Sequence, residues 1–234
     1  MKTLKYQLLA ASMFACTAAF AQTAPAGPDP KAFKLTPTAT AGTAAQDRSA
    51  YKTGTTNDAL VQQSINNQYA NVDQIAGPVS GNTADVYQLG GDHNNATIAQ
   101  DARTAGFAGR NEARIDQFGY YNTSDQKQTG GGNHAYSVQA SSTTYSSASQ
   151  TQTGQGNDAY IRQTNGKNNY ASQSQGVEGE NNAQIFQEGT NGSTAIQTQM
   201  GGRENEASTT QNGAASYSQI NQNGSQNQAI VTQR

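Results

Sequence analysis

Residues 157–163 read Asn-Asp-Ala-Tyr-Ile-Arg-Gln, and residues 181–187 read Asn-Asn-Ala-Gln-Ile-Phe-Gln. Both are copies of one seven-residue phrase that places a small polar residue, Ala, a variable residue and Gln at alternate positions. Fifteen copies begin at Asn57, Gln68, Asn82, Asn94, Asn111, Asn122, Asn133, Ser146, Asn157, Asn169, Asn181, Ser193, Asn205, Ser216 and Asn227. The first position is Asn or Ser in all but one copy, the third is Ala in all but two, and the seventh is Gln in all fifteen. An internal repeat of this regularity decides the fold class.

The four fixed positions of the phrase lie two residues apart, so in an extended chain they project from one face. On a helix they would scatter around the cylinder. The fixed positions number 60 and none is charged, whereas about eight charges would be expected by chance in a chain that is 13% charged. Charged residues such as Glu112, Arg114 and Asp116 occupy the intervening positions. Each phrase is therefore predicted to be a strand with one buried face and one solvent-exposed face, in a strongly specified register.

The fifth position of the phrase carries a second-order pattern. From Ser146 onward it reads Gln150, Ile161, Gln173, Ile185, Gln197, Thr209, Ile220 and Val231. The early alternation predicts that two phrases close one coil of a solenoid. Stacked coils would lie about 4.8 Å apart, with equivalent side chains forming ladders as in cross-β assemblies.

The sequence thus predicts an all-β fold, a β-solenoid of strand-turn-strand repeats over residues 57–234, with fifteen half-repeats. The predicted core ladder comprises Gln152, Asn157, Ala159, Ile161, Gln163, Asn181, Ala183, Ile185 and Gln187. Glycines that follow the phrases are expected at turn positions with positive φ: Gly90, Gly130, Gly154, Gly166, Gly189, Gly201, Gly213 and Gly224.

Two segments precede the repeats. Lys2 and Lys5 stand before an apolar run that ends in Ala19-Phe20-Ala21, so residues 1–21 are predicted to be a secretory signal peptide, with a run too short to span a membrane. Residues 22–56 are rich in Pro, Ala and Thr and lack the phrase, so we expect a flexible segment outside the core.

Two gaps between phrases are wider than the others, one at Pro78 and one at the insertion 101–110, and longer loops are expected there.

Composition excludes several classes of protein. Only 33% of the residues are hydrophobic and Trp is absent, so a Gln/Asn-rich disordered chain is the main structural alternative. Disorder, however, would not require register to be kept. Cys16 within the signal run gives a lipoprotein alternative, which Met13 and Phe14 fit poorly. Cleavage after Ala21 leaves no cysteine and 12 basic against 16 acidic residues, a net charge of −4. We therefore expect no disulfide and no nucleic-acid partner.

No constellation of catalytic residues is found in the sequence. His93 and His134 lie on separate units of the repeat and are expected at solvated positions, and no Gly-x-Ser-x-Gly elbow or calcium-binding Gly-Gly-x-Gly-x-Asp run occurs. The sequence therefore predicts no enzyme, with no catalytic, cofactor-binding or metal-binding residue.

One pair of phrases has a spacing that is found in a known family. Ser146 is followed by Gln152, Gly154, Asn157, Ala159 and Gln163, and the last pair repeats this spacing with Ser216, Gln222, Gly224, Asn227, Ala229 and Gln233. Asn122 to Gln139 has the same spacing with a leading Asn. Over residues 57–234 the chain resembles a curlin, the subunit of bacterial curli amyloid fibres.

The resemblance carries expectations about function. It implies export through an outer-membrane secretion channel guided by residues 22–56, and polymerisation outside the cell into amyloid fibres that scaffold biofilm and mediate adhesion. The partners it implies are other copies of the chain and a curli nucleator. The fifteen regular phrases suit the major subunit, while the ending Val231-Thr232-Gln233-Arg234 is similar to the nucleator.

A solenoid of this kind is expected to polymerise through its first and last coils, whose strand edges are unpaired. The predicted polymerisation edges are Asn57, Gln63, Ser216, Gln222, Asn227 and Gln233. Outward charges such as Asp158 and Glu188 either slow premature assembly or only keep a solvated face soluble. A secreted adhesin solenoid that does not polymerise is the remaining alternative.

Overall fold

The computed structural model describes residues 57–64, 67–78, 80–103, 109–140, 142–176 and 179–234. The predicted signal peptide and the 22–56 segment lie outside these residues. The described chain forms fifteen strands and no helix: β1 (Asp58–Ser64), β2 (Tyr69–Ile75), β3 (Asn82–Leu89), β4 (Asn95–Asp101), β5 (Asn111–Gln117), β6 (Thr123–Gly131), β7 (His134–Gln139), β8 (Ser147–Gln155), β9 (Asp158–Thr164), β10 (Tyr170–Gln175), β11 (Asn182–Glu188), β12 (Thr194–Met200), β13 (Glu206–Asn212), β14 (Tyr217–Asn223) and β15 (Gln228–Gln233). Each strand corresponds to one phrase of the repeat.

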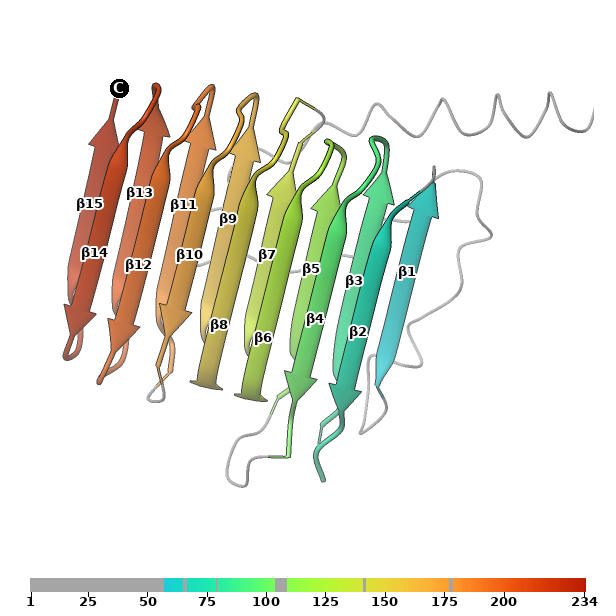
Figure 1. Cartoon of the computed structure of the whole chain (residues 1–234). Helices are drawn as coiled ribbons and strands as arrows, with labels where there is room; N and C mark the ends of the chain where they lie inside the picture. The colour runs from blue at the N-terminus through green and yellow to red at the C-terminus, as the bar shows by residue number, and fades with distance from the viewer. Residues whose placement is uncertain (1–56, 65–66, 79, 104–108, 141, 177–178) are drawn as a thin grey trace, which may run out of the picture.

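The strands alternate between two sheets as the chain advances. The odd-numbered strands, from β1 to β15, form an eight-stranded sheet, and the even-numbered strands, from β2 to β14, form a seven-stranded sheet. All neighbours within a sheet are parallel, while the two sheets run in opposite directions (Figure 1). Two strands therefore make one coil, and the predicted β-solenoid with a two-phrase unit is confirmed.

The register aligns identical positions of the phrase in successive coils. Between β9 and β11, for example, Ala159 pairs with Ala183, Ile161 with Ile185 and Gln163 with Gln187. This is the ladder arrangement predicted from the alternation of fixed residues. A shift by one residue would turn the intervening charged side chains into the core, which explains why one register is kept throughout.

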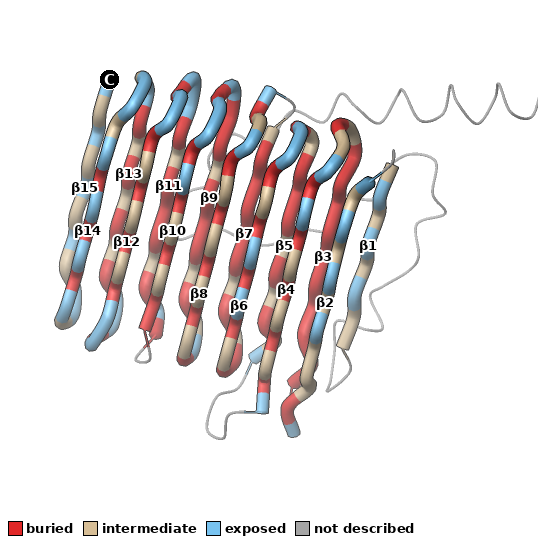
Figure 2. Tube along the Cα trace, in the orientation of Figure 1, coloured by how far each residue is buried: buried red, intermediate tan, exposed pale blue. Residues whose placement is uncertain are grey.

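The core is a narrow layer between the two sheets, made from the fixed face of the strands and buried from β3 to β14 (Figure 2). Ile161 and Ile185 of the eight-stranded sheet pack against Ala148, Ala171 and Ala195 of the seven-stranded sheet. A large residue on one sheet thus meets a small residue on the other, which keeps the layer thin. Each buried Ile side chain contributes about 1.5 to 3 kcal/mol through its removal from water.

The turns contain more left-handed backbone than the glycines alone predicted. Glycines at the predicted turn positions have positive φ, but Gly166 does not, and that prediction is wrong. Gly166 is needed for space instead, since a Cβ there would lie 2.1 Å from the carbonyl oxygen of Thr190 in the next coil. Ten non-glycine residues also have positive φ, most of them in the position directly before a phrase, such as Tyr145 before Ser146 and Glu180 before Asn181.

The two irregular gaps both fall in connections from the seven-stranded to the eight-stranded sheet. Pro78 is an exposed residue between β2 and β3, as expected for a loop. Gly77 beside it lies so close to the next connection that a Cβ would be 2.0 Å from the Ala102 carbonyl oxygen. The described parts of the two loops therefore stack on each other, and residues 104–108 of the insertion lie outside the described residues.

The outward face of the eight-stranded sheet differs from the prediction of a wet face. Asp116 is 3% exposed and Tyr160 is 1% exposed, although both occupy intervening positions of the phrase. Arg114 pairs with Asp116 at 2.8 Å, and Tyr136 donates a 2.6 Å hydrogen bond to the same carboxylate. The Arg114 guanidinium also lies 4.9 Å from the Tyr87 ring centroid. These charges are tolerated in a buried position because each has partners of opposite charge or polarity.

The outward face of the seven-stranded sheet, by contrast, agrees with the prediction, since Asp125 and Lys127 are exposed.

The buried tyrosines predict sensitivity to alkaline pH. Burial raises the pKa of Tyr160 to about 12 from its ordinary value of 10. Because the folded-state pKa is raised, the stabilisation is complete below pH 10 and is lost as the pH rises towards 12, a loss of about 2 to 3 kcal/mol. We expect the β-sheet circular dichroism signal to disappear in this pH window together with a rise in tyrosinate absorbance. The Tyr160→Phe variant should lose less stability between pH 10 and 12 than the wild type, and an identical loss in both would contradict the prediction.

Candidate functional site: the side-chain ladders and the open strand edges

The seventh position of the phrase forms a continuous glutamine ladder in each sheet. In the eight-stranded sheet, the amide of each Gln donates to the side-chain oxygen of the next, from Gln63 to Gln233 over distances of 2.6 to 2.9 Å. In the seven-stranded sheet the ladder runs from Gln74 to Gln222 over 2.7 to 3.0 Å. Both ladders donate in the same direction, from the N-terminal coil towards the C-terminal coil.

From Gln74 onward, the ladder glutamines also join the two sheets. The Gln152 amide nitrogen donates to the next ladder member Gln175 at 2.9 Å, and to the backbone oxygens of His134 and Asn157 at 2.8 Å each. Gln163 makes the equivalent contacts to Gln187, Ser147 and Asn169. The glutamine side chains thus bond to the next coil along the axis and to the opposite sheet across it, which satisfies polar groups that burial would otherwise penalise.

The first position of the phrase forms a ladder with the opposite polarity. In the eight-stranded sheet, the side-chain amide of each Asn donates back to the Asn of the preceding coil, from Asn227 to Asn57 at 2.9 to 3.1 Å. The predicted ladder residues Asn157 and Asn181 are adjacent members, 3.1 Å apart. All nine predicted core-ladder residues lie on the buried face between the sheets.

The N-terminal edge of the solenoid consists of β1 and β2. Here the predicted residue Gln63 starts the glutamine ladder, so among the described residues nothing donates to its side-chain oxygen. Asn57 starts the asparagine ladder, and its side-chain amide donates only to the backbone oxygen of Gln74. Val61, on the core-facing side of β1, is 44% exposed because no strand lies beyond it.

The C-terminal edge consists of β14 and β15 and carries the four other predicted residues. Gln233 donates to the backbone of Tyr217 and Gln222 to that of Glu206, which leaves one amide hydrogen on each without a ladder partner. Asn227 ends the asparagine ladder with an unoccupied acceptor oxygen. Ser216 opens β14, and its backbone N–H donates to Ser193. The free glutamine donors and the Asn227 acceptor at this edge correspond to the free glutamine acceptors and the Asn57 donor at the N-terminal edge.

The sequence prediction missed part of the N-terminal edge. The seven-stranded sheet ends at β2, so Gln68 and Gln74 also belong to the edge. Gln74 starts the second glutamine ladder, and within the described part of the chain no donor bonds to the buried side-chain oxygen of Gln68. Gln68 is the one first position of the phrase that is neither Asn nor Ser, and this exception was the sequence signal for the edge. The signal could not be interpreted without knowing that both sheets contribute a strand to the edge.

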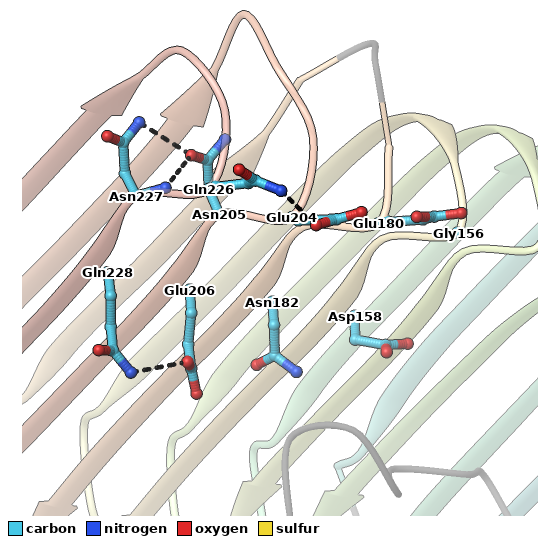
Figure 3. Close-up of a pocket in the computed structure, with 10 residues that line it drawn as sticks. All are labelled: Gly156, Asp158, Glu180, Asn182, Glu204, Asn205, Glu206, Gln226, Asn227 and Gln228. Atoms are coloured by element: carbon cyan, nitrogen blue, oxygen red, sulfur yellow. Dashed lines mark hydrogen bonds between the residues drawn. The ribbon is translucent and has the colours of Figure 1, made fainter.

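An open groove of about 550 Å³ runs along the turns from the seven-stranded to the eight-stranded sheet at the C-terminal end. Its lining includes two columns of residues that stack coil on coil: Gly156, Glu180, Glu204 and Gln226 from the turns, and Asp158, Asn182, Glu206 and Gln228 from the strands (Figure 3). In the strand column, acids alternate with amides, and Gln228 donates to Glu206 at 3.0 Å. This alternation keeps like charges two coils apart and limits their repulsion.

The described residues contain no group of three or more His, Cys, Asp or Glu that could hold a metal ion, and no helix long and apolar enough to cross a membrane. His134 pairs with Asp158 at 2.6 Å and is half-buried rather than solvated as expected. Comparison with protein-family models, with curated proteins and with solved structures found no match to this chain.

Proposed function

We propose that this protein is a structural subunit of an extracellular amyloid fibre of the curli type. Subunits add end to end, the β14/β15 edge of one meeting the β1/β2 edge of the next. The observation that carries the proposal is the complementarity of the two edges. Glutamine donors and an asparagine acceptor stand open at one end, and the matching glutamine acceptors and asparagine donor stand open at the other.

The two strands of the C-terminal edge also lack proline and charge, two features that normally prevent strands from pairing with other chains. Soluble proteins protect sheet edges with proline, charge or a covering segment. Neither β14 nor β15 contains a charged residue or a proline, and Ile230 on β15 is 67% exposed. Short, uncharged strands of this kind that stack in register are typical of cross-β assemblies.

The resemblance to curlins supplies the biological context of the proposal. By this resemblance we propose that the fibre lies at the cell surface after secretion, with roles in adhesion and biofilm, and that its partners are a nucleator and a secretion channel. Fifteen regular half-repeats favour the major subunit over the nucleator, since the body of a fibre needs long uninterrupted ladders.

The proposal is tested by incubating purified residues 22–234 at micromolar concentration without denaturant and recording X-ray fibre diffraction. We expect meridional intensity at about 4.8 Å and an equatorial band at about 10 Å. Preformed fibres should also shorten the lag of fresh protein. A folded monomer that stays in solution and gives no oriented pattern would reject the fibre and favour the adhesin alternative.

A further inference from the structure

The two ends of the solenoid are stepped. The eight-stranded sheet begins at β1 and ends at β15, while the seven-stranded sheet begins at β2 and ends at β14. At each end, therefore, one strand of the eight-stranded sheet extends beyond the other sheet (Figure 1). The odd number of strands in the described residues is the reason, because strands alternate strictly between the sheets.

The next subunit can dock in the same orientation or after a half-turn about the fibre axis. Because of the step, these two modes differ in the number of strand edges that they leave unpaired. If the next subunit keeps the same orientation, its β1 pairs with β15, and one strand position between β14 and the next β2 stays empty. The edges of both strands, including the ladder residues Gln222 and Gln74, would then face a gap. Each backbone or amide group buried there without a partner costs about 1 to 3 kcal/mol.

We propose that successive subunits in the fibre are related by a half-turn about the fibre axis. This inference rests on the proposed end-to-end assembly. The half-turn places β1 of the next subunit against β14, and β2 against β15, so that the two steps interlock. Strand direction is preserved, because the two sheets run in opposite directions and the rotation exchanges them (Figure 1). Strands then alternate across the junction as they do within the chain, and the fibre repeats every second subunit.

The fifth position of the phrase supports this mode. In the middle of the chain the two sheets differ there: β6, β8, β10 and β12 carry a ladder of Gln126, Gln150, Gln173 and Gln197. At the ends the sheets become alike, with Val61 and Val72 at one edge and Ile220 and Val231 at the other. The half-turn brings Val61 onto Ile220 and Val72 onto Val231. Exchange of the sheets at the junction therefore stacks aliphatic side chains on aliphatic side chains, with no glutamine of the fifth-position ladder involved.

The hydrogen-bonding groups also fit. Both glutamine ladders donate towards the C-terminal end, so Gln222 can donate to Gln63 of the next subunit and Gln233 to Gln74. Asn57 would follow Ser216, and the chain already contains this succession, since the Asn169 backbone N–H donates to the Ser146 hydroxyl at 3.2 Å. Asn227 would meet Gln68, a succession at the first position that the described strands do not contain, and the Gln68 side chain carries an amide donor for the Asn227 oxygen.

Disulfide trapping distinguishes the two modes, because residues 22–234 contain no cysteine. Leu60, Gln219 and Ile230 occupy the same outward position of the phrase on β1, β14 and β15. Facing residues of neighbouring strands lie within the Cα separation that a disulfide spans. Fibres are grown under reducing conditions, oxidised, dissolved in formic acid and separated on non-reducing gels. The L60C/Q219C variant should give a ladder of covalent multimers, whereas L60C/I230C and the single L60C control should remain monomeric.

The outcomes separate this inference from the proposed function. A multimer ladder from L60C/I230C, with none from L60C/Q219C, would overturn the half-turn while leaving end-to-end assembly in place. If fibres form and neither cysteine pair cross-links, the half-turn is also overturned. Absence of fibres from the wild type would reject the proposed function itself. Electron cryomicroscopy of wild-type fibres provides a second measurement, in which we expect an axial repeat of two subunits.

Discussion

Introducing proline at both strands of the C-terminal edge, as Gln219→Pro with Ile230→Pro, is expected to abolish fibre formation by the variant alone. The backbone N–H of Glu206 bonds to Asn227 and that of Thr194 to Ser216, so alternate residues of β15 and β14 face inward. The N–H groups of Ile230 and Gln219 therefore point to the free edge. Proline removes them and leaves the facing carbonyl groups of the next subunit without donors, at a cost of about 1 to 3 kcal/mol per strand, so the affinity of the edge for the next subunit should fall by about thirtyfold or more.

The double-proline variant keeps its β1/β2 edge, so it should add to the C-terminal end of a wild-type fibre and stop growth there at substoichiometric amounts. Single-fibre imaging would show growth at one end only. The matched control, Gln219→Thr with Ile230→Thr, retains the N–H groups and should polymerise. Circular dichroism of the proline variant checks that its β-structure is intact. Growth at the wild-type rate by a folded proline variant would contradict the proposed edge.

Replacing one buried ladder amide by a carboxylate, Gln152→Glu, is expected to destabilise the protein by about 3 to 5 kcal/mol at pH 7. The amide nitrogen of Gln152 donates to three oxygens, those of Gln175, His134 and Asn157. A carboxylate would place a charge against these oxygens and remove the donor. Burial would raise the pKa of this Glu, so its protonated form should be stable near pH 4 and stability should fall as the pH rises above the unfolded-state value of about 4.3.

The control for this experiment is the neighbouring outward residue. Thr151→Glu adds the same charge, and Thr151 pairs in register with Lys127. We expect the stability of this variant to stay within about 0.5 kcal/mol of the wild type. Denaturant unfolding at pH 4 and pH 7, followed by circular dichroism, measures both variants. Equal stability of Gln152→Glu and Thr151→Glu at pH 7 would mean that the ladder amides contribute little to the fold.

Much of the site could be predicted because ladder residues are recognisable in the sequence. Gln163 and Gln187 had to stack once each phrase was a strand and each coil contained two phrases. The outward face was harder to predict. Asp116 and Tyr160 look like solvated positions in the sequence, and both are buried against Tyr136 of the neighbouring coil, while Arg114 pairs with Asp116 along the same strand.

The strand register, the two-phrase coil and the identity of the core ladders could all be predicted from the sequence. These follow from the alternation of side chains along one strand, a local property that repetition amplifies. The polarity of the ladders, the membership of β2 in the N-terminal edge and the step at each end became visible only in the folded arrangement. The reason is that hydrogen-bond direction and strand order are relations between coils, and no single phrase contains them.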